Sequence, residues 1–334
     1  MCRSDERGAV SLTLKLNQLT REYVNQEVRM TLLLTDLKIK TARNGKQYAD
    51  LKMQDQTQKC DVRLWDYDQY EDALASLKLP AIVDCRLLVG EYREQIQLTV
   101  KKIQPADSQE MAIDDFVQTS SWDEEKMKEW LHDYYEFIKA PHIRQLVQEM
   151  VFSEGYYEKF CTYPAAKTVH HNFMHGIMQH TLEVLKYVKM VAVTKRLSLR
   201  QQDRLLAMAF LHDWAKIEEY EPVPSESLTL EGRMLGHIFI GAHKTQNVIL
   251  GIQGFDRDDA LIIMNGILGH HGAYEWGSPV LPKTVEAQIL HQADKLSGDV
   301  ESVLSFMERQ QAQQDGFTDK LWNMGTDYYK GGIE

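Results

Sequence analysis

The residues whose chemistry stands out lie in the stretch Phe210–Tyr220, which reads FLHDWAKIEEY. His212 directly precedes Asp213 at the end of an apolar helical run, and Lys216 follows one turn later. Adjacent helical side chains point roughly 100° apart, so this pair could approach one ion from two directions. A lone His-Asp pair is common by chance and is more simply a surface dipeptide. Its interpretation therefore depends on His and Asp residues elsewhere in the chain.

Further candidate ligands lie on other predicted helices. His180 falls on an apolar stripe one turn before Val184, although a lone His on such a stripe is usually a satisfied core residue. Asp294 shares a helix face with Leu290 and Ser297, and an unpaired buried carboxylate is costly, so a cation is a natural partner. The remaining candidates are His237 and one of the adjacent pair His270 and His271.

Together these positions predict a metal centre, formed by His180, His212, Asp213, His237, His270 or His271, and Asp294. Imidazole mixed with carboxylate suits first-row ions such as Mn²⁺ or Fe²⁺ better than a Mg²⁺ site of oxygen alone. Two ions about 3.5–4 Å apart would clamp a phosphate and supply a hydroxide nucleophile at neutral pH. Lys216 is placed to meet a phosphate oxygen, or alternatively to interact with the C-terminal end of a helix dipole.

The other histidines are expected to have lesser roles. His132 and His142 have no carboxylate in helical register, so we expect them to be solvated or to cap helices. His243 points away from the face that carries His237. Three histidines at or before the start of the His180 helix could contact substrate or line the entrance: His170, His171 and His175.

Residues 12–104 alternate between short apolar runs and turn residues, as β-strands do. The expected strands are Glu27–Lys40, Gln47–Gln54, Lys59–Trp65, Ala81–Glu91 and Glu94–Ile103. Asn44-Gly45 indicates a tight turn between the first two strands, and Asp68–Leu79 reads as a short helix between the third and fourth. Five strands in this order predict an OB-fold barrel.

Such barrels bind single-stranded nucleic acid through a basic groove and aromatic stacking platforms. The candidates for these contacts are Tyr48, Trp65 and Tyr92, with Lys46 and Arg63 nearby in the sequence. Each aromatic side chain could instead belong to a core or face the second domain.

The fold class predicted is therefore multidomain β + α, an N-terminal five-stranded barrel followed by an all-α domain. After residues 12–104 we expect a polar linker over 105–120 and a helical connector over 121–160. The candidate ligands fall in a helical domain over 161–310, which is followed by a C-terminal tail over 311–334. Its expected helices include Arg200–Glu219, Asp258–Gly269 and Thr284–Met307.

The composition limits the class of protein. The net charge of −11 is not the positive charge usual for a nucleic-acid-binding protein, but charge is distributed unevenly along the chain. Residues 1–104 hold 17 Lys+Arg against 15 Asp+Glu, and the remaining residues hold 21 against 34. The sequence contains no run of 18 apolar residues, so no membrane span is expected. The start MCRSDERGAV lacks the apolar core of a secretory signal. Four scattered cysteines without CxxC spacing favour a reducing cytoplasm.

Residues 165–300 resemble an HD-type metal-dependent phosphohydrolase domain. The resemblance rests on QHT at His180, HDWAK at His212–Lys216, GH at His237, HHG at His270–Gly272 and HQAD ending at Asp294. The N-terminal region contains YADLKMQDQT and VRLWD ahead of a strand ending in QIQLTV. With this barrel in front, the whole chain is similar to the YhaM-type 3′→5′ exoribonucleases.

The resemblance implies an all-α HD core behind an OB-fold barrel, in a hydrolase that releases nucleotides stepwise from a 3′ end. The substrate would be single-stranded RNA, with single-stranded DNA as an alternative. One or two divalent ions are implied, with Mn²⁺ favoured and Fe²⁺, Co²⁺ or Mg²⁺ as alternatives. A homo-oligomer is compatible with the sequence, and no membrane partner is expected.

The family's site residues carry over by motif. The resemblance implies that the first metal is held by His180, His212, Asp213 and Asp294. A second would be held by His237 and His270, with His271 as a ligand or a neighbour. Asp213 would thus be both ligand and catalytic residue, and Lys216 would touch the scissile phosphate. His171 would contact substrate or protonate a leaving group.

Two other functions stay open. The HD domain could act on free or cyclic nucleotides, although such an enzyme has little need of a barrel. The chain could also be a non-catalytic nucleic-acid-binding adaptor whose helical domain is only scaffold. The intact set of motif positions argues against that second alternative.

Overall fold

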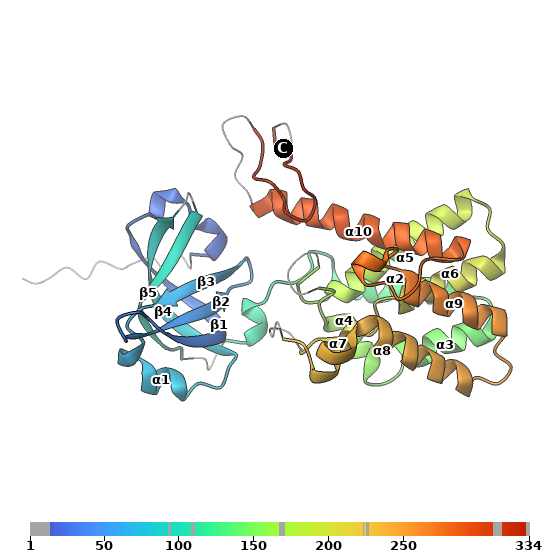
Figure 1. The fold of residues 1–334 in the computed structure, drawn as a ribbon, viewed down its shortest axis with the longest axis horizontal. Coiled ribbons are helices and arrows are strands. Elements are labelled where there is room, and N and C mark those ends of the chain that lie inside the picture. The colour runs from blue at the N-terminus through green and yellow to red at the C-terminus, as the bar shows by residue number, and fades with distance from the viewer. Residues whose placement is uncertain are drawn as a thin grey trace, which may run out of the picture. The chain divides into compact units, whose positions relative to one another are not determined.

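The structure is a computed structural model that describes residues 14–92, 95–107, 111–166, 171–222, 224, 227–309 and 316–331. The chain divides into two compact units between Gln118 and Thr119 (Figure 1). The first unit is a closed β-barrel and the second is helical, so the predicted β + α fold class is confirmed. Among the described residues, no helix combines the length and apolarity that crossing a bilayer requires.

The first unit contains five strands that close in the order β1-β2-β3-β5-β4. They are β1 (Glu27–Thr41), β2 (Gln47–Gln54), β3 (Lys59–Leu64), β4 (Ala81–Tyr92) and β5 (Gln95–Pro105). Only the β3–β5 contact is parallel among these strand pairs. Four strands begin at the predicted residue, and Glu94, the predicted start of the fifth, lies outside the described residues.

Period-two alternation places one face of each strand inside the barrel. In β2, Ala49, Leu51 and Met53 are almost fully buried, whereas Lys52 faces outward. The helix predicted between the third and fourth strands is shorter than expected, because a 3₁₀ turn precedes α1 (Glu71–Ala75). α1 buries only Leu74 and so offers no apolar face on which further turns could pack.

Part of the predicted linker packs against the barrel. Ile113–Phe116 forms a 3₁₀ turn, and Gln54 Nε2 donates to the carbonyl oxygen of Phe116 at 3.0 Å. Ser120 belongs to the second unit, because its backbone nitrogen donates to Met174 O at 3.0 Å. The segment that reads as polar spacer is thus tied to a different unit at each end.

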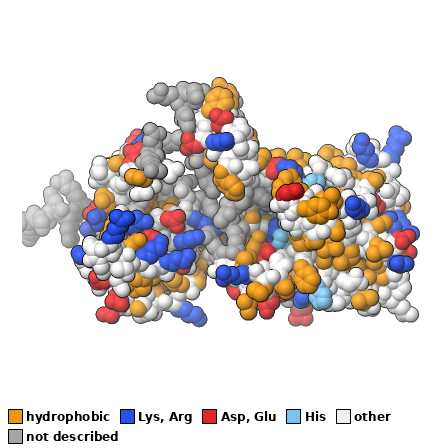
Figure 2. Space-filling model, viewed as in Figure 1, with side chains coloured by type: hydrophobic (Ala, Val, Ile, Leu, Met, Phe, Trp, Pro, Cys, Tyr) orange, Lys and Arg blue, Asp and Glu red, His pale blue; other side chains and the backbone are white. Residues whose placement is uncertain are grey.

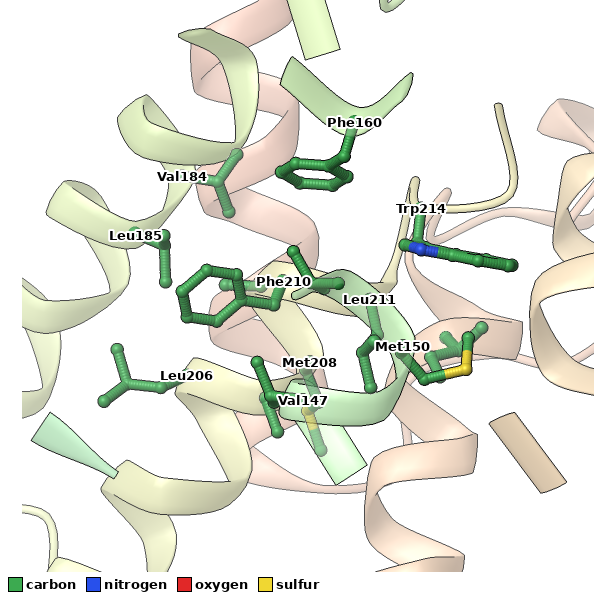
Figure 3. Packing of buried hydrophobic residues seen from close by; sticks show 14 of the residues in the cluster. Val147, Met150, Phe160, Val184, Leu185, Leu206, Met208, Phe210, Leu211 and Trp214 are labelled. Atoms are coloured by element: carbon green, nitrogen blue, oxygen red, sulfur yellow. The ribbon is translucent and has the colours of Figure 1, made fainter. Parts of the chain in front are cut away.

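The second unit is formed by nine helices in the described residues. They are α2 (Glu124–Phe137), α3 (Pro141–Val151), α4 (Tyr156–Thr162), α5 (Gly176–Thr194), α6 (Leu199–Leu211), α7 (Lys216–Glu219), α8 (Leu230–Gly251), α9 (Arg257–Gly269) and α10 (Val285–Arg309). Figure 3 shows the core around α6, where Phe210 and Trp214 pack among side chains such as Val147, Met150 and Leu185.

The predicted continuous helix Arg200–Glu219 is wrong at one point. α6 ends at Leu211, His212 caps it, and α7 starts only at Lys216. The intervening Trp214 is fully buried in the core, which holds the chain in this turn. The break places His212 and Asp213 in the turn between α6 and α7 rather than inside one long helix.

Candidate active site and strand-binding face

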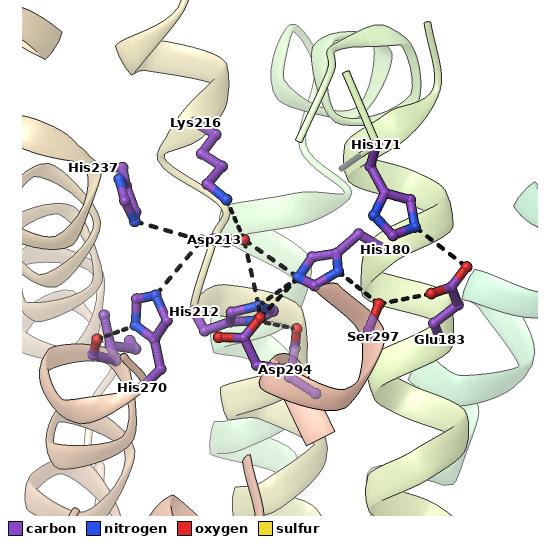
Figure 4. A network of polar contacts seen from close by, with 12 residues as sticks. His171, His180, Glu183, His212, Asp213, Lys216, His237, His270, Asp294 and Ser297 are labelled. Atoms are coloured by element: carbon purple, nitrogen blue, oxygen red, sulfur yellow. Dashed lines mark hydrogen bonds and ion pairs between the residues drawn. The ribbon is translucent and has the colours of Figure 1, made fainter. Parts of the chain in front are cut away.

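Four predicted ligands from three separate parts of the chain converge in the helical unit (Figure 4). His180 lies on α5, His212 and Asp213 follow α6, and Asp294 lies on α10. Nε2 of His180 is 3.2 Å from Nε2 of His212, 3.2 Å from Oδ1 of Asp294 and 3.4 Å from Oδ2 of Asp213. The structure therefore brings these four side chains together, with their ligand atoms within 4.8 Å of one another.

The other oxygen of Asp213 faces a second group of imidazoles. Asp213 Oδ1 is 3.5 Å from Nε2 of His237 and 3.6 Å from Nε2 of His270. All three atoms are buried, and none has a hydrogen-bond partner among the described residues. Buried polar atoms without a partner are costly, so this donor set fits a cation. His271 joins His237 and His270 in a group whose ligand atoms lie within 4.8 Å of one another.

Every imidazole in the two groups presents Nε2 to the pocket, because Nδ1 is engaged elsewhere. The Nδ1 contacts are with Ser297 Oγ for His180 (3.0 Å), Ala209 O for His212 (2.9 Å), Glu219 Oε2 for His237 (3.1 Å), Ile267 O for His270 (2.7 Å) and Trp276 O for His271 (2.7 Å). A contact at one ring nitrogen fixes the tautomer and leaves the other nitrogen to bind a metal.

Sequence reasoning missed the carboxylates that orient two of these rings. Glu219 contacts Nδ1 of His237 and also accepts from its backbone nitrogen at 3.1 Å. Ser297, which accepts from His180, donates to Glu183 Oε2 at 2.6 Å. Helical spacing was the available signal, since Glu183 lies three residues after His180.

A glycine directs His237 into the pocket. Gly236 lies inside α8 with φ 72° and ψ 154°, and it kinks the helix there. A positive φ strains residues that carry a Cβ, so glycine is the residue that tolerates this kink. The next side chain, His237, thereby comes within 3.5 Å of Asp213 Oδ1.

Burial and charge set the protonation of the first group. Burial disfavours the charged form of Asp213, but the charge of Lys216 holds the pKa of Asp213 well below its usual value. Burial lowers the pKa of His212 to about 4, which leaves the ring neutral. Burial also opposes a charge on His180, yet its hydrogen bonds to Asp213 and Asp294 raise that pKa to about 9. An ion bound here would displace the His180 proton, as metal binding generally does.

Lys216 and His171 lie on different sides of the first group of ligands. Lys216 Nζ donates to Asp213 Oδ2 at 2.6 Å, at the edge of the first group. The His171 side chain is completely buried, and its Nε2 lies 3.3 Å from Glu183 Oε1. Its ring centroid is 5.3 Å from that of His180, so His171 lies behind the ligand ring. Contact between His171 and substrate stays a prediction.

The remaining histidines include one expectation that was wrong. His142 does have a carboxylate partner, because its Nε2 lies 2.7 Å from Oδ2 of Asp259 in α9. The partner comes from a distant helix, so helical register could not identify it. Nδ1 of His175 contacts Cys161 O at 2.7 Å, and His170 lies outside the described residues.

On the barrel, the structure brings three of the predicted contact residues together. The rings of Tyr48 and Trp65 lie 5.3 Å apart, and the Arg63 guanidinium lies 5.5 Å and 5.0 Å from their centroids. Trp65 and Tyr92 are 48% and 56% exposed, so neither belongs to a core. Lys46 is exposed in the turn before β2. Figure 2 shows Lys and Arg side chains spread over the visible face of the barrel.

Comparison with known proteins identifies the relatives of the chain. The HD domain family model matches residues 177–299. The 3′-5′ exoribonuclease YhaM of Bacillus licheniformis is 32% identical over 287 residues, which cover 86% of this chain and 89% of the relative. YhaM of Bacillus subtilis matches to the same extent, and YhaM of a Geobacillus strain is 30% identical over 312 residues, covering 92% and 93%.

Solved structures resemble a smaller part of the chain. The mitochondrial single-stranded DNA binding protein Rim1 of S. cerevisiae is 11% identical, with a TM-score of 0.22, and the match covers 24% of this chain and 93% of Rim1. The second OB-fold domain of replication protein A from Methanococcus maripaludis is 18% identical, with a TM-score of 0.23, covering 28% and 94%. At 32% identity over 86% of its length, this chain belongs to the YhaM family of 3′-5′ exoribonucleases.

Proposed function

We propose that this protein is a divalent-metal-dependent 3′→5′ exoribonuclease that hydrolyses phosphodiester bonds of single-stranded RNA and releases nucleotides. The observation that best supports this function is that two groups of imidazoles share one carboxylate, that of Asp213. Its Oδ2 faces His180 and its Oδ1 faces His237. Family membership supports the reaction and its direction.

We assign one ion to His180, His212, Asp213 and Asp294, and a second to His237 and His270, with His271 as a further ligand or a neighbour. A divalent ion held there would act as a Lewis acid toward the scissile phosphate and activate the attacking water. Lys216 places a positive charge beside Asp213, where a phosphate oxygen would approach. Asp213 positions both ligand groups through its two oxygens.

We propose that His171 also orients the pocket, in addition to the predicted contact with substrate. Its ring contacts Glu183, and Glu183 contacts His180 through the Ser297 hydroxyl. This chain of buried contacts holds the His180 ring and fixes its protonated nitrogen. His171 therefore acts on His180 through Glu183 and Ser297.

We propose Mn²⁺ as the ion, with Fe²⁺, Co²⁺ and Mg²⁺ as alternatives. The mixture of imidazole and carboxylate in both groups supports a first-row ion over Mg²⁺. Metal-depleted protein reloaded with each ion in turn would rank them by turnover and by the number of ions retained.

We propose that the barrel holds the strand while the helical unit cleaves its end. Tyr48 and Trp65 would stack on bases, and Arg63, Lys46 and Tyr92 would line the same path. Single-stranded DNA is the alternative substrate, since stacking and phosphate contacts do not read the sugar.

The test uses RNA labelled at its 5′ end and incubated with Mn²⁺. A ladder that shortens one nucleotide at a time from the 3′ end supports the proposal, and intact RNA contradicts it. Cleavage of free or cyclic nucleotides without cleavage of RNA would favour the mononucleotide alternative, and protein without bound metal would favour the adaptor. Nothing in the described residues favours either of these.

We further propose that the protein works in the cytoplasm. Cys60, Cys85 and Cys161 are free thiols, and burial raises the pKa of Cys60 and Cys85 to about 12. Such thiols are unreactive and suit a reducing compartment. A homo-oligomer stays a prediction that sedimentation would test.

A further inference from the structure

The burial of the ligands shows where solvent reaches the pocket. His180, His212 and His270 have completely buried side chains and form its floor. The side chains of Asp294 and His237 keep 18% and 14% of their surface exposed. Substrate would therefore approach between the α10 turn that carries Asp294 and the α8 segment that carries His237.

Trp276 lies beside this opening, on the loop that joins α9 to α10. Its carbonyl oxygen accepts from Nδ1 of His271 at 2.7 Å, so the loop touches the second imidazole group directly. Its ring centroid is 6.2 Å from that of His291, and Lys295 Nζ is 5.7 Å from it. His291 and Lys295 flank Asp294 within one turn of α10, which places the indole next to a proposed ligand.

The loop that carries the indole is anchored at several points. Gly277, with φ 91°, closes a turn by donating to Tyr274 O at 3.0 Å. The buried Ser278 accepts from Gly272 N at 3.1 Å. His291 Nδ1 contacts His270 O at 2.7 Å and ties the end of α9 to α10. Trp276 is nevertheless 56% exposed, so an anchored backbone presents an aromatic face to solvent.

We propose that Trp276 is a stacking platform for an unpaired nucleobase of a nucleotide that flanks the scissile phosphate. This rests on the proposed function, because it names how that site holds its strand. An indole offers a large π-face to any base, so the platform would tolerate all four. Its anchored loop lowers the ordering cost of binding.

The first test measures binding without cleavage. RNA with 2-aminopurine at its last or second-last position is titrated with protein in buffer without divalent ions. Wild-type protein should quench the fluorescence by stacking. Trp276→Ala should abolish the quenching and weaken binding by roughly 5- to 150-fold, the range that about 1–3 kcal/mol per stacked base implies. Trp276→Phe, which keeps an aromatic face, should restore part of both.

The matched control is Trp322→Ala, since Trp322 is 79% exposed in the C-terminal segment and has no part in the proposal. It should bind and quench as wild type does. Because the backbone contacts of Trp276 do not depend on its ring, Trp276→Ala should melt at the wild-type temperature. Equal quenching by Trp276→Ala and Trp322→Ala would overturn the proposal.

The second test uses RNA whose last or second-last nucleotide lacks its base. Trp276→Ala should cleave natural RNA more slowly than wild type, mainly through a higher KM. On one of the two abasic strands the variant and wild type should cleave equally, which identifies the stacked nucleotide. A penalty that persists on both strands contradicts the platform. Bis(p-nitrophenyl) phosphate, which has no base, reports the metal site separately: wild-type protein that cleaves it but not RNA would contradict the proposed function, while the binding test still decides on Trp276.

Discussion

The barrel and the helical unit use the same residue types under opposite conditions. Asp50 on the barrel pairs with Lys40 at 2.7 Å and with Arg63 at 3.0 Å, and its side chain is 31% exposed. Asp213 contacts Lys216 at 2.6 Å with only 3% exposed. Water screens the first set, so each pair adds little to stability. In the pocket, removal of one partner leaves an uncompensated buried group, so the contacts depend on one another.

The largest loss of activity is expected from a substitution in the pocket, His212→Ala. Removing this ring should cost more activity than the about 10–100-fold that a lost outer partner of a metal ligand costs. The substitution should also remove bound metal. Elemental analysis measures the metal, and the RNA ladder measures the activity. His243→Ala on the exposed face of α8 is the control and should retain both. Wild-type metal content in His212→Ala would contradict the assignment.

A buried carboxylate outside the pocket tests whether burial itself makes the difference. Asp259 is 1% exposed and contacts Arg200, Arg204 and His142. Asp259→Asn should destabilise the protein by about 3–5 kcal/mol, because it removes the buried carboxylate charge that pairs with Arg204, whose side chain is 11% exposed. The exposed counterpart Asp50→Asn should hardly shift the unfolding midpoint in urea. Equal shifts for the two variants would break the comparison.

The same aspartate predicts a pH dependence. Burial opposes the charge of Asp259, but hydrogen bonds from Arg200, His142 and Arg204 hold its pKa below the usual value. A lowered folded-state pKa contributes stability above the unfolded value of about 3.9 and loses it as the pH falls. Urea unfolding from pH 7 to pH 3 should therefore show the gap between wild type and Asp259→Asn narrowing in acid.

A smaller effect is expected from Glu219→Gln, which keeps the shape but weakens the acceptor for His237. Metal affinity at the second group should fall by about 10–100-fold, as measured by titration with Mn²⁺. Glu218→Gln changes the adjacent residue, which is only partly buried, and should leave the affinity unchanged. A loss of equal size in both variants would mean that general destabilisation of α7 is the cause.

The smallest effect is expected on the barrel, from Trp65→Ala. Losing one stacking face should weaken binding of long RNA by roughly 5- to 100-fold in fluorescence anisotropy. Cleavage of bis(p-nitrophenyl) phosphate should not change, because that substrate is too short to need a strand-binding face. A matching loss on both substrates would show that Trp65 supports the fold of the protein.

The expected strands agree closely with the structure because period two is a local property of the chain. In β2, Ala49, Leu51 and Met53 enter the core for the same reason, so the pattern alone was sufficient. Helix ends were less predictable. The apolar run through Trp214 could not reveal whether the chain continues as a helix or turns, and the structure turns there.

The candidate ligands were recognisable because His and Asp side chains on apolar helix faces are rare and costly. Their partners were not recognisable to the same degree. Glu219 follows the HD stretch closely, yet nothing in its type or spacing assigns it to His237, which lies in another helix. His142 likewise gains Asp259 only through helix packing.

The amino-acid sequence by itself determined the β and α units of this protein, the starts of β1 to β4 and the helix faces that carry candidate ligands. Those properties depend on neighbours a few residues away. Only the tertiary structure decided that Asp213 faces two imidazole groups, that His171 lies behind His180, and that Trp276 stands beside the opening. Such relations join residues far apart in the chain, and packing of whole helices sets their distances.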